Sequence, residues 1–240
     1  MCPGLPAVPQ RERSVALKDQ AGKPLRPELA FASDSSLLIS FDPATGVAGR
    51  RAVGALVALL DGHPFDGFVD LSPAALSLLV RFDPVRQDHD AVAAHLAALL
   101  DRLEEAPVRT TRLITIPVEY GGAAGPDLED VARIAGLTPD EVIARHAAGT
   151  YEVLFLGFSP GFAYLGGLDP RLHCPRLESP RTVVPSGSVG IAGAQTAVYP
   201  SSTPGGWRLI GRTSLSLFDP GRRPMTLLER GDEVHFAPRT

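Results

Sequence analysis

Lysine and asparagine are almost absent from this chain of 240 residues. Lys18 and Lys23 are the only lysines, and there is no asparagine at all. A P-loop nucleotide site needs Lys-Ser or Lys-Thr after a glycine-rich turn, so this class of site is excluded. The folded body can hold no Schiff-base lysine and no Cys-His-Asn triad either, because the residues for them are missing.

Cysteine and long apolar runs are scarce as well. Cys2 and Cys174 are too few for a disulfide scaffold or a cysteine-based zinc site, and the histidine spacing fits no metal motif. The longest apolar runs fall far short of the roughly 18 residues of a membrane span, and residues 1–30 contain no signal-peptide core. From these absences we expect a cytoplasmic protein that binds no metal and no membrane. Because the formal net charge is −4, we expect no nucleic-acid partner either.

What the chain does contain is turns, since 24 glycines and 23 prolines argue against a helical bundle. Residues 1–30 are expected to be a flexible extension. Residues 31–106 alternate strands and helices in the order β-α-β-β-α, which makes up most of a ferredoxin-like unit and predicts a small α/β domain. The strands are expected at 36–41, 65–71 and 76–82, and the amphipathic helices at 53–60 and 92–103.

Residues 107–240 have a different pattern. A strand is expected at 113–118, where Pro117 predicts an edge position. Two short helices follow, the second with a capping box that begins at Thr138. From Tyr151 onward, short apolar runs alternate with Gly/Pro turns, which is typical of a β-barrel or sandwich. The expected fold class is therefore α+β, with a small N-terminal domain and a C-terminal β domain.

Residues 157–161, Gly-Phe-Ser-Pro-Gly, match the G-x-S-x-G elbow of serine hydrolases. In that elbow, the residue after the nucleophile donates its backbone N–H to the oxyanion hole. Here that residue is Pro160, which has no N–H. We therefore interpret this segment as a structural turn.

The stretch 181–213 is the most informative one for chemistry, because polar side chains stand among glycines that let the backbone approach a ligand. Such a stretch either lines a ligand pocket or forms a barrel corner whose polar groups are satisfied internally. Arg176, Arg181 and Arg212 can hold a carboxylate or phosphate, or else lie in ion pairs or at the surface. Trp207, the single tryptophan, fits either a pocket wall or a core anchor.

Four segments together resemble one known family. They are residues 155–171, 179–189, 195–200 and 204–213. In these segments the chain is similar to the KipI family, which is the B subunit of 5-oxoprolinase, also called allophanate hydrolase subunit 1 or a carboxyltransferase-domain half. The resemblance implies a small N-terminal α/β domain followed by a cyclophilin-like β-barrel.

The resemblance also implies a heteromeric enzyme that opens 5-oxoproline to glutamate with hydrolysis of ATP. The expected partners are a homologous, KipA-like C subunit and an A subunit, and the chain alone is expected to be inactive. ATP with Mg²⁺ is the expected cofactor, with contacts from the partner subunits. Two alternatives stay open: a biotin-dependent carboxyltransferase subunit of the allophanate hydrolase and urea carboxylase type, and a KipI-like inhibitor of a histidine kinase.

Activating a lactam requires donors that meet the charge developing on its oxygen. Under the resemblance, the side chains that do so are expected to face one pocket that the partner subunit completes. The expected catalytic residues are Gln195, Tyr199 and Arg212. The expected substrate- or nucleotide-binding residues are Phe162, Arg181, Ser186, Gly187, Ser188, Thr196 and Trp207. Among these, the arginines are expected to hold a carboxylate or phosphate, and Gly187 and Ser188 to supply backbone donors.

Overall fold

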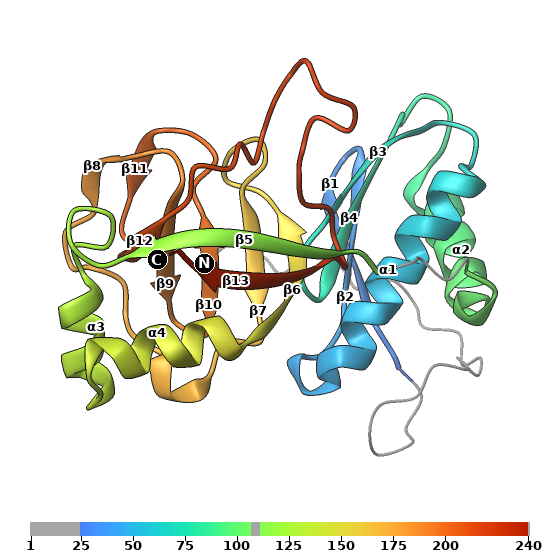
Figure 1. Cartoon of the computed structure of the whole chain (residues 1–240). Helices are drawn as coiled ribbons and strands as arrows, with labels where there is room; N and C mark the ends of the chain where they lie inside the picture. The colour runs from blue at the N-terminus through green and yellow to red at the C-terminus, as the bar shows by residue number, and fades with distance from the viewer. Residues whose placement is uncertain (1–24, 107–110, 240) are drawn as a thin grey trace. The chain divides into compact units, whose positions relative to one another are not determined.

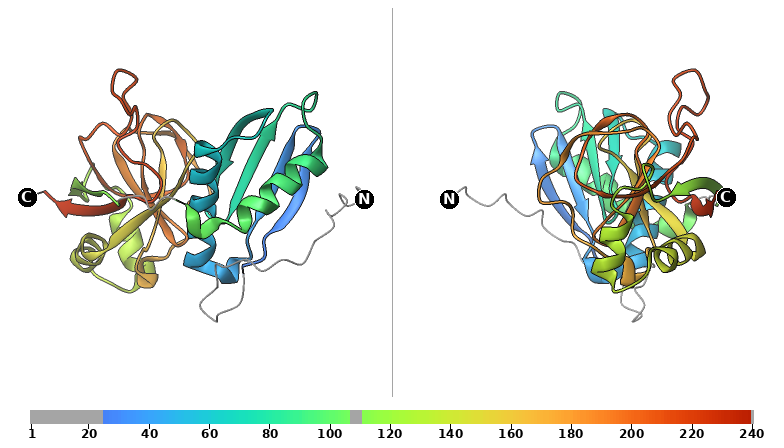
Figure 2. Two further views of the ribbon diagram at one scale, coloured as in Figure 1. Left: turned by 90° about the vertical axis from the view of Figure 1, so that its right-hand side faces the viewer. Right: turned by 60° about the vertical axis from the view of Figure 1, so that its left-hand side comes forward.

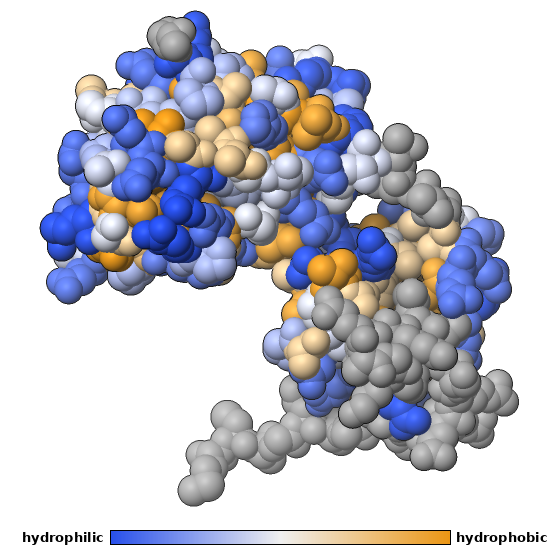
Figure 3. All heavy atoms as spheres, turned by 60° about the horizontal axis from the view of Figure 1, so that its bottom comes forward, coloured by the Kyte–Doolittle hydropathy of each residue, from blue (hydrophilic) through white to orange (hydrophobic). Residues whose placement is uncertain are grey.

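The structure is a computed structural model that describes residues 25–106 and 111–239. The chain divides into two compact units, residues 1–109 and 110–240, and each has its own apolar core (Figure 1). Within the described ranges, no helix is both long and apolar enough to cross a membrane. Hydrophilic and hydrophobic side chains lie interspersed on the face shown in Figure 3.

The N-terminal unit is a four-stranded sheet covered by two helices. Its elements are β1 (Glu28–Ser33), β2 (Ser36–Ser40), α1 (Gly46–Gly62), β3 (Phe68–Pro73), β4 (Ser77–Phe82) and α2 (His89–Leu100), with 3-10 turns at Pro43–Thr45 and Leu103–Glu105. The strands are antiparallel in the order β1-β2-β4-β3. Leu78, Val80 and Phe82 alternate along β4 and share one core with both helices, so the helices lie on one face of the sheet (Figure 2).

The predicted β-α-β-β-α order is present as β2 to α2. The sequence pattern does not predict β1, because Glu28–Ser33 lacks the alternation of a half-buried strand. β1 includes residues 28–30, which the pattern assigns to the extension, and Leu25 is already buried. The fourth strand thus precedes the β-α-β-β-α run, and the ferredoxin-like assignment stays a prediction.

The C-terminal unit is a closed β-barrel with two helices. Its elements are β5 (Leu113–Tyr120), α3 (Leu128–Ala135), α4 (Pro139–Ala148), β6 (Thr150–Leu156), β7 (Ala163–Gly166), a 3-10 turn (Pro170–Leu172), β8 (Arg181–Val184), β9 (Ser188–Ala192), β10 (Gln195–Val198), β11 (Thr203–Gly205), β12 (Arg208–Arg212) and β13 (Glu233–Pro238). In the described part of this unit, seven strands close the barrel in the order β10-β7-β6-β13-β5-β12-β9, and β8 and β11 form a separate ribbon. α3 packs against α4 and β12, and α4 packs against β13. The predicted barrel and the two helices before it are confirmed.

β5 lies between two strands of the barrel, so the edge position predicted from Pro117 is wrong. β5 pairs in parallel with β13, where Pro117 lies opposite Ala237, and antiparallel with β12. The pairing with β12 involves only Glu119 and Tyr120. The missing N–H of Pro117 therefore falls before that ladder begins and interrupts none of its hydrogen bonds.

A second apolar cluster lies on the other face of β9 and β10. All 5 residues of β9 are buried. Val189 and Ile191 belong to the barrel core, whereas Ala192 belongs to the second cluster. Its other members are Phe162, Val184, Ala197, Tyr199, Trp207 and Leu209. Because side chains alternate between the two faces of a strand, the ribbon β8–β11 and the turn ending at Phe162 cover the outer face of the barrel here.

Candidate functional site

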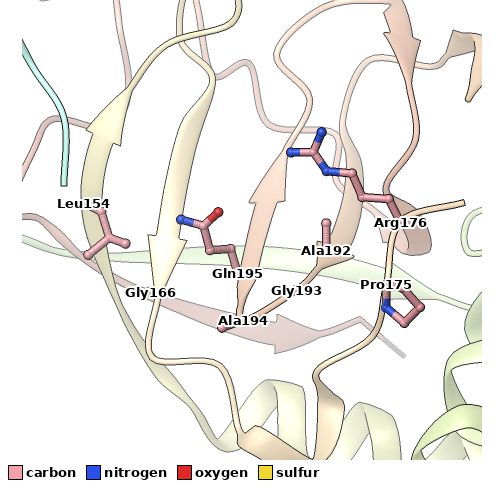
Figure 4. A pocket seen from close by; sticks show the side chains of 8 residues that line it. All are labelled: Leu154, Gly166, Pro175, Arg176, Ala192, Gly193, Ala194 and Gln195. Carbon is pink, nitrogen blue, oxygen red and sulfur yellow. The ribbon is translucent and has the colours of Figure 1, made fainter. Parts of the chain in front are cut away.

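Among the described residues, two neighbouring cavities of the barrel unit share one side chain, Arg176. The larger has a volume of about 650 Å³ and is lined by Leu154, Gly166, Pro175, Arg176, Ala192, Gly193, Ala194 and Gln195 (Figure 4). The smaller has a volume of about 90 Å³ and is lined by Phe158, Phe162, Tyr164, Arg176, Tyr199, Pro204, Gly205, Gly206 and Trp207. Of the described residues that line the two cavities, Arg176 is the one with a charge.

The tip of the β9–β10 hairpin forms one wall of the larger cavity. Ala192 pairs with Gln195 across a two-residue turn, and Gly193 in that turn has a φ of 56°. A positive φ at the first residue of such a turn favours glycine. The N–H of Gly193 donates to the carbonyl of Cys174 at 2.7 Å, which ties the hairpin tip to the segment that carries Arg176. Figure 4 shows the Gln195 amide and the Arg176 guanidinium extending to the same side of this turn.

The Arg176 side chain is exposed, and it contacts an aromatic ring rather than a carboxylate. Its Cζ atom lies 5.9 Å from the centre of the Trp207 ring, which is a cation–π arrangement. Arg176 makes no hydrogen bond or ion pair with any other residue that the structure describes. Arg181 and Arg208, by contrast, each pair with an aspartate. The guanidinium of Arg176 therefore has its N–H donors available for a ligand.

Aromatic rings line the smaller cavity. The Phe162 ring lies 5.2 Å from the Tyr199 ring and 5.7 Å from the Trp207 ring, both edge-on. Burial raises the pKa of Tyr199, and a backbone hydrogen bond from Trp207 opposes that shift. Phe158 is 61% exposed at the rim and has a φ of 69°, which is rare for an aromatic residue. Strained backbone of this kind is found more often at functional sites than elsewhere.

The predicted catalytic residues do not share one cavity. Gln195 lines the larger cavity, Tyr199 lines the smaller one, and Arg212 lines neither. Trp207 is both a core anchor and a pocket wall, because it is buried in the second apolar cluster and lines the smaller cavity. The same is true of Phe162. The single pocket expected from the sequence is thus two neighbouring cavities with Arg176 between them.

A turn beside the backbone of Tyr199 contains Ser186, Gly187 and Ser188, and Arg212 is hydrogen-bonded to it. The Nε of Arg212 donates to the Ser186 carbonyl at 2.9 Å. The N–H of Gly187 donates to the Tyr199 carbonyl at 2.7 Å, and the N–H of Ser188 donates within the turn at 3.2 Å. The backbone donors predicted at Gly187 and Ser188 are therefore used within the protein, because the turn closes on itself, and they are not free to bind an anion.

Arg181 holds a carboxylate, and that carboxylate belongs to the protein. Its Nη2 lies 2.7 Å from Oδ1 of Asp127, whose side chain is 7% exposed. The other carboxylate oxygen of Asp127 accepts the N–H of Leu209 at 2.7 Å. The ion pair therefore links β8 to the start of α3 and to β12, and Arg181 lines neither cavity.

Thr196 lies inside the barrel and takes part in a chain of buried hydrogen bonds. Its hydroxyl donates to the Gly190 carbonyl at 3.0 Å and lies 3.0 Å from Nε2 of His146. Since the hydroxyl has one hydrogen and uses it on the carbonyl, Nε2 must donate to Thr196. Nδ1 of His146 then accepts from the Tyr120 hydroxyl at 2.7 Å. Burial lowers the pKa of His146 to about 3, which agrees with a neutral ring.

The Gly-Phe-Ser-Pro-Gly segment is a turn between β6 and β7, as predicted. The N–H of Ser159 donates to the Gly157 carbonyl at 2.8 Å, and the N–H of Phe162 donates to the Ser159 carbonyl at 3.0 Å. The hydroxyl of Ser159 is buried and has no hydrogen-bond partner among the described residues. No described base is therefore in place to activate it as a nucleophile.

Sequence reasoning did not separate Arg176 from the other two candidate arginines. The distinguishing contact of Arg181 is with Asp127, 54 positions away, and no local spacing reveals it. Phe158 and the Gly193 turn were missed as well, although a Gly-Ala pair between two apolar runs is a signal for a hairpin turn. Across residues 25–106 and 111–239, no group of three His, Cys, Asp or Glu side chains could hold a metal ion.

The fold is that of a carboxyltransferase domain. The family model of the carboxyltransferase domain, subdomain C and D, matches residues 27–228. The crystal structure of TTHA0988 is 34% identical, with a TM-score of 0.74, and the match covers 85% of this chain and 40% of that one. The urea carboxylase of Kluyveromyces lactis has the same fold at 21% identity, with a TM-score of 0.72 over 98% of this chain and 23% of that one.

Sequence relatives narrow this class. The 5-oxoprolinase B subunit of Bacillus subtilis (strain 168) is 43% identical in an alignment over 222 residues that covers 88% of this chain and 92% of that protein. The match therefore covers nearly the whole of both chains. The chain belongs to the family of 5-oxoprolinase B subunits.

Proposed function

We propose that the chain is the B subunit of an ATP-dependent 5-oxoprolinase, which converts 5-oxoproline, ATP and water to glutamate, ADP and phosphate. One observation carries the proposal: the chain is 43% identical to the B. subtilis protein over 88% of its own length and 92% of that protein. A fold alone does not define a function. A match at this identity along nearly the whole length supports the same role for the whole chain.

The proposed partners are the homologous C subunit and an A subunit. The chain covers 40% of TTHA0988 and 23% of the K. lactis urea carboxylase, so in those proteins the same fold is joined to further polypeptide. We propose that other subunits supply the corresponding surfaces to this chain. We therefore expect the chain to be inactive alone and active in the assembled enzyme.

The partner subunits are proposed to supply most of the ATP contacts. Phosphoryl transfer needs several positive charges around the phosphates, usually from Lys, Arg and Mg²⁺. This chain has no lysine after Lys23, and Arg176 is the one charged residue among the described residues lining its two cavities. A triphosphate is therefore poorly matched to this chain, whereas a small substrate with a single charge is well matched.

Among the residues predicted from the sequence, Gln195 has the position best suited to orienting the lactam amide, because it lines the larger cavity. Tyr199 is proposed to act from the smaller cavity, beside Trp207. Arg212 binds the Ser186 carbonyl and is proposed to hold the turn beside Tyr199 rather than to touch substrate.

The test is reconstitution of the enzyme from this chain with the A and C subunits. We expect glutamate release from 5-oxoproline that requires ATP and stops when this chain is omitted. Gln195→Ala is expected to lower the rate, and Thr182→Ala, at an exposed position on β8, serves as its control. If the complete mixture releases no glutamate, or releases as much without this chain, the proposal is wrong.

The same preparation tests the two alternatives. Co-purification of a biotinylated protein together with urea-dependent ATP hydrolysis would indicate a carboxyltransferase subunit of the urea carboxylase type. Inhibition of histidine-kinase autophosphorylation by this chain alone would indicate a regulator. Either result, without any turnover of 5-oxoproline, would replace the proposed function.

A further inference from the structure

We propose that Arg176 binds the carboxylate of the substrate in the larger cavity, and thereby makes the enzyme select 5-oxoproline over an uncharged lactam. This inference rests on the proposed function and names the residue that recognises the substrate's charged end. The sequence offers three arginines for an anion, and the structure separates Arg176 from the other two.

The charge of Arg176 has no anionic partner among the described residues. Arg181 binds Asp127 and Arg212 binds the Ser186 carbonyl. Arg176 makes no hydrogen bond or ion pair with a described residue, yet it lines both cavities. A guanidinium with its donors available at a cavity wall is suited to hold a carboxylate through two parallel hydrogen bonds.

The Arg176 side chain already contacts an aromatic ring before a ligand arrives. The Arg176 Cζ lies 5.9 Å from the centre of the buried Trp207 ring. Contact with an aromatic face restricts a long side chain that is otherwise mobile. Less conformational entropy is then lost when a ligand binds, which favours affinity.

The larger cavity has a second polar side chain, that of Gln195. The Gln195 amide and the Arg176 guanidinium extend to the same side of the hairpin turn (Figure 4). The residues between them are small, and a Cβ atom on Gly193 would meet nothing within 4 Å, so the space above the turn is open. A small molecule that carries a carboxylate and an amide, as 5-oxoproline does, has the groups that these two side chains bind. The volume of about 650 Å³ is ample for it.

A phosphate group is the other anion that arginine commonly binds. One guanidinium balances the single charge of a carboxylate, whereas the phosphates of ATP need several cations or Mg²⁺. No second charged side chain is found among the described residues that line either cavity. The site therefore favours the carboxylate.

The experiment compares Arg176→Gln and Arg176→Lys in the assembled enzyme, with Arg133→Gln as the control. Arg133 lies on the surface of α3 and pairs with Asp130, away from both cavities. We expect Arg176→Gln to raise the KM for 5-oxoproline by about tenfold to a hundredfold, the usual effect of losing a charge-assisted hydrogen bond. The lysine variant, which keeps the charge but loses the paired donors, should fall between wild type and Arg176→Gln. Arg133→Gln should leave KM unchanged.

Inhibition by 2-pyrrolidone, the same ring without the carboxylate, separates recognition of charge from a general loss of structure. Its inhibition constant should be the same in the wild type and in Arg176→Gln, because it has no group for Arg176 to hold. Two results would overturn this inference while the wild-type assembly turns over and the proposed function stands. In the first, Arg176→Gln keeps the wild-type KM for 5-oxoproline. In the second, Arg176→Gln weakens the binding of 2-pyrrolidone as much as the binding of 5-oxoproline. If the wild-type assembly releases no glutamate, it is the proposed function that fails.

Discussion

The hydroxyl oxygen of Thr196 lies 3.0 Å from Nε2 of His146 in the interior of the barrel. The hydrogens of this chain of bonds run in one direction, from Tyr120 through His146 and Thr196 to the Gly190 carbonyl. Thr196 is adjacent to Gln195 on β10, and successive residues of a strand point to opposite faces. The buried hydrogen bonds therefore fix β10 from inside the barrel, and β10 presents Gln195 to the larger cavity.

Replacing Thr196 with valine should destabilise the barrel. The valine keeps the shape of the side chain but leaves the Nε2 hydrogen of His146 without an acceptor in a buried position. We expect the free energy of unfolding to fall by about 1–3 kcal/mol, the usual cost of an unsatisfied buried group. Urea unfolding followed by the fluorescence of Trp207, the single tryptophan, reports this unit. Thr182→Val, at an exposed position, should change little, and equal stability of the two variants would contradict the role of Thr196.

The two local motifs of the barrel unit were predictable from sequence because their partners are close in the chain. The capping box places the Thr138 N–H donor 2.8 Å from the Glu141 carboxylate and the Glu141 N–H donor 3.2 Å from the Thr138 hydroxyl. The turn at 157–161 is likewise closed by its own backbone groups. In both cases, the residue types and their spacing in the sequence already identify the two groups that interact.

The polar residues of the site were less predictable, because their partners are far away in the chain. Thr196 stands near glycines in the sequence, and this pattern suggests a ligand-binding residue. Its partner His146, however, is 50 positions away and inside the barrel. Pro117 suggests an edge because the sequence of a single strand does not show which neighbours that strand has. Composition and periodicity predict a turn-rich barrel, whereas the way its strands pair decides which side chains are buried.

Stability of the barrel unit should decrease in mild acid because of His146. Burial lowers the pKa of this residue from 6.5 to about 3 in the folded chain. Between these values the unfolded chain binds a proton that the folded chain does not, so lowering the pH favours unfolding. We expect the free energy of unfolding to fall as the pH drops from 6.5 towards 3, by up to about 1.4 kcal/mol per pH unit from this group.

The matching measurement is the slope of unfolding free energy against pH in His146→Gln and His173→Gln. The first variant removes the buried imidazole and should flatten the slope between these pH values, whatever its effect on stability at neutral pH. His173→Gln, at an exposed position, is the histidine replacement with which the slope of His146→Gln is compared. Identical slopes in the wild type and His146→Gln would show that another group causes the pH dependence.

Arg181 should prove to be a structural residue. Arg181→Met leaves Asp127 largely buried and without its cation. We expect a loss of about 1–3 kcal/mol of unfolding free energy, with a lower fraction of folded enzyme but an unchanged KM for 5-oxoproline in the molecules that fold. Asp127→Asn combined with Arg181→Met should cost less than the sum of the single changes, because the two side chains interact. A raised KM at unchanged stability would instead place Arg181 in substrate binding.

The close approach of Gly205 to Tyr199 allows a test of how the smaller cavity contributes to packing and substrate binding. A Cβ atom at position 205 would overlap the Tyr199 hydroxyl and ring, whereas one at Gly206 would lie 3.6 Å from the nearest atom, on Pro180. Gly205→Ala must therefore displace the Tyr199 ring, while Gly206→Ala makes an ordinary contact. We expect Gly205→Ala to lower the free energy of unfolding by about 1–3 kcal/mol, as overpacking does, and to shift the emission of Trp207.

The neighbouring glycine makes this pair of variants informative about function as well as packing. Tyr199 and Trp207 line the smaller cavity together with Arg176. A displaced Tyr199 disturbs its hydrogen bond with the backbone of Trp207, whose ring contacts the Arg176 guanidinium. Gly205→Ala should therefore raise the KM for 5-oxoproline in the assembled enzyme, and Gly206→Ala should not. If Gly205→Ala alters Trp207 emission but leaves KM unchanged, the residues of the smaller cavity stabilise the fold and do not contribute to substrate binding.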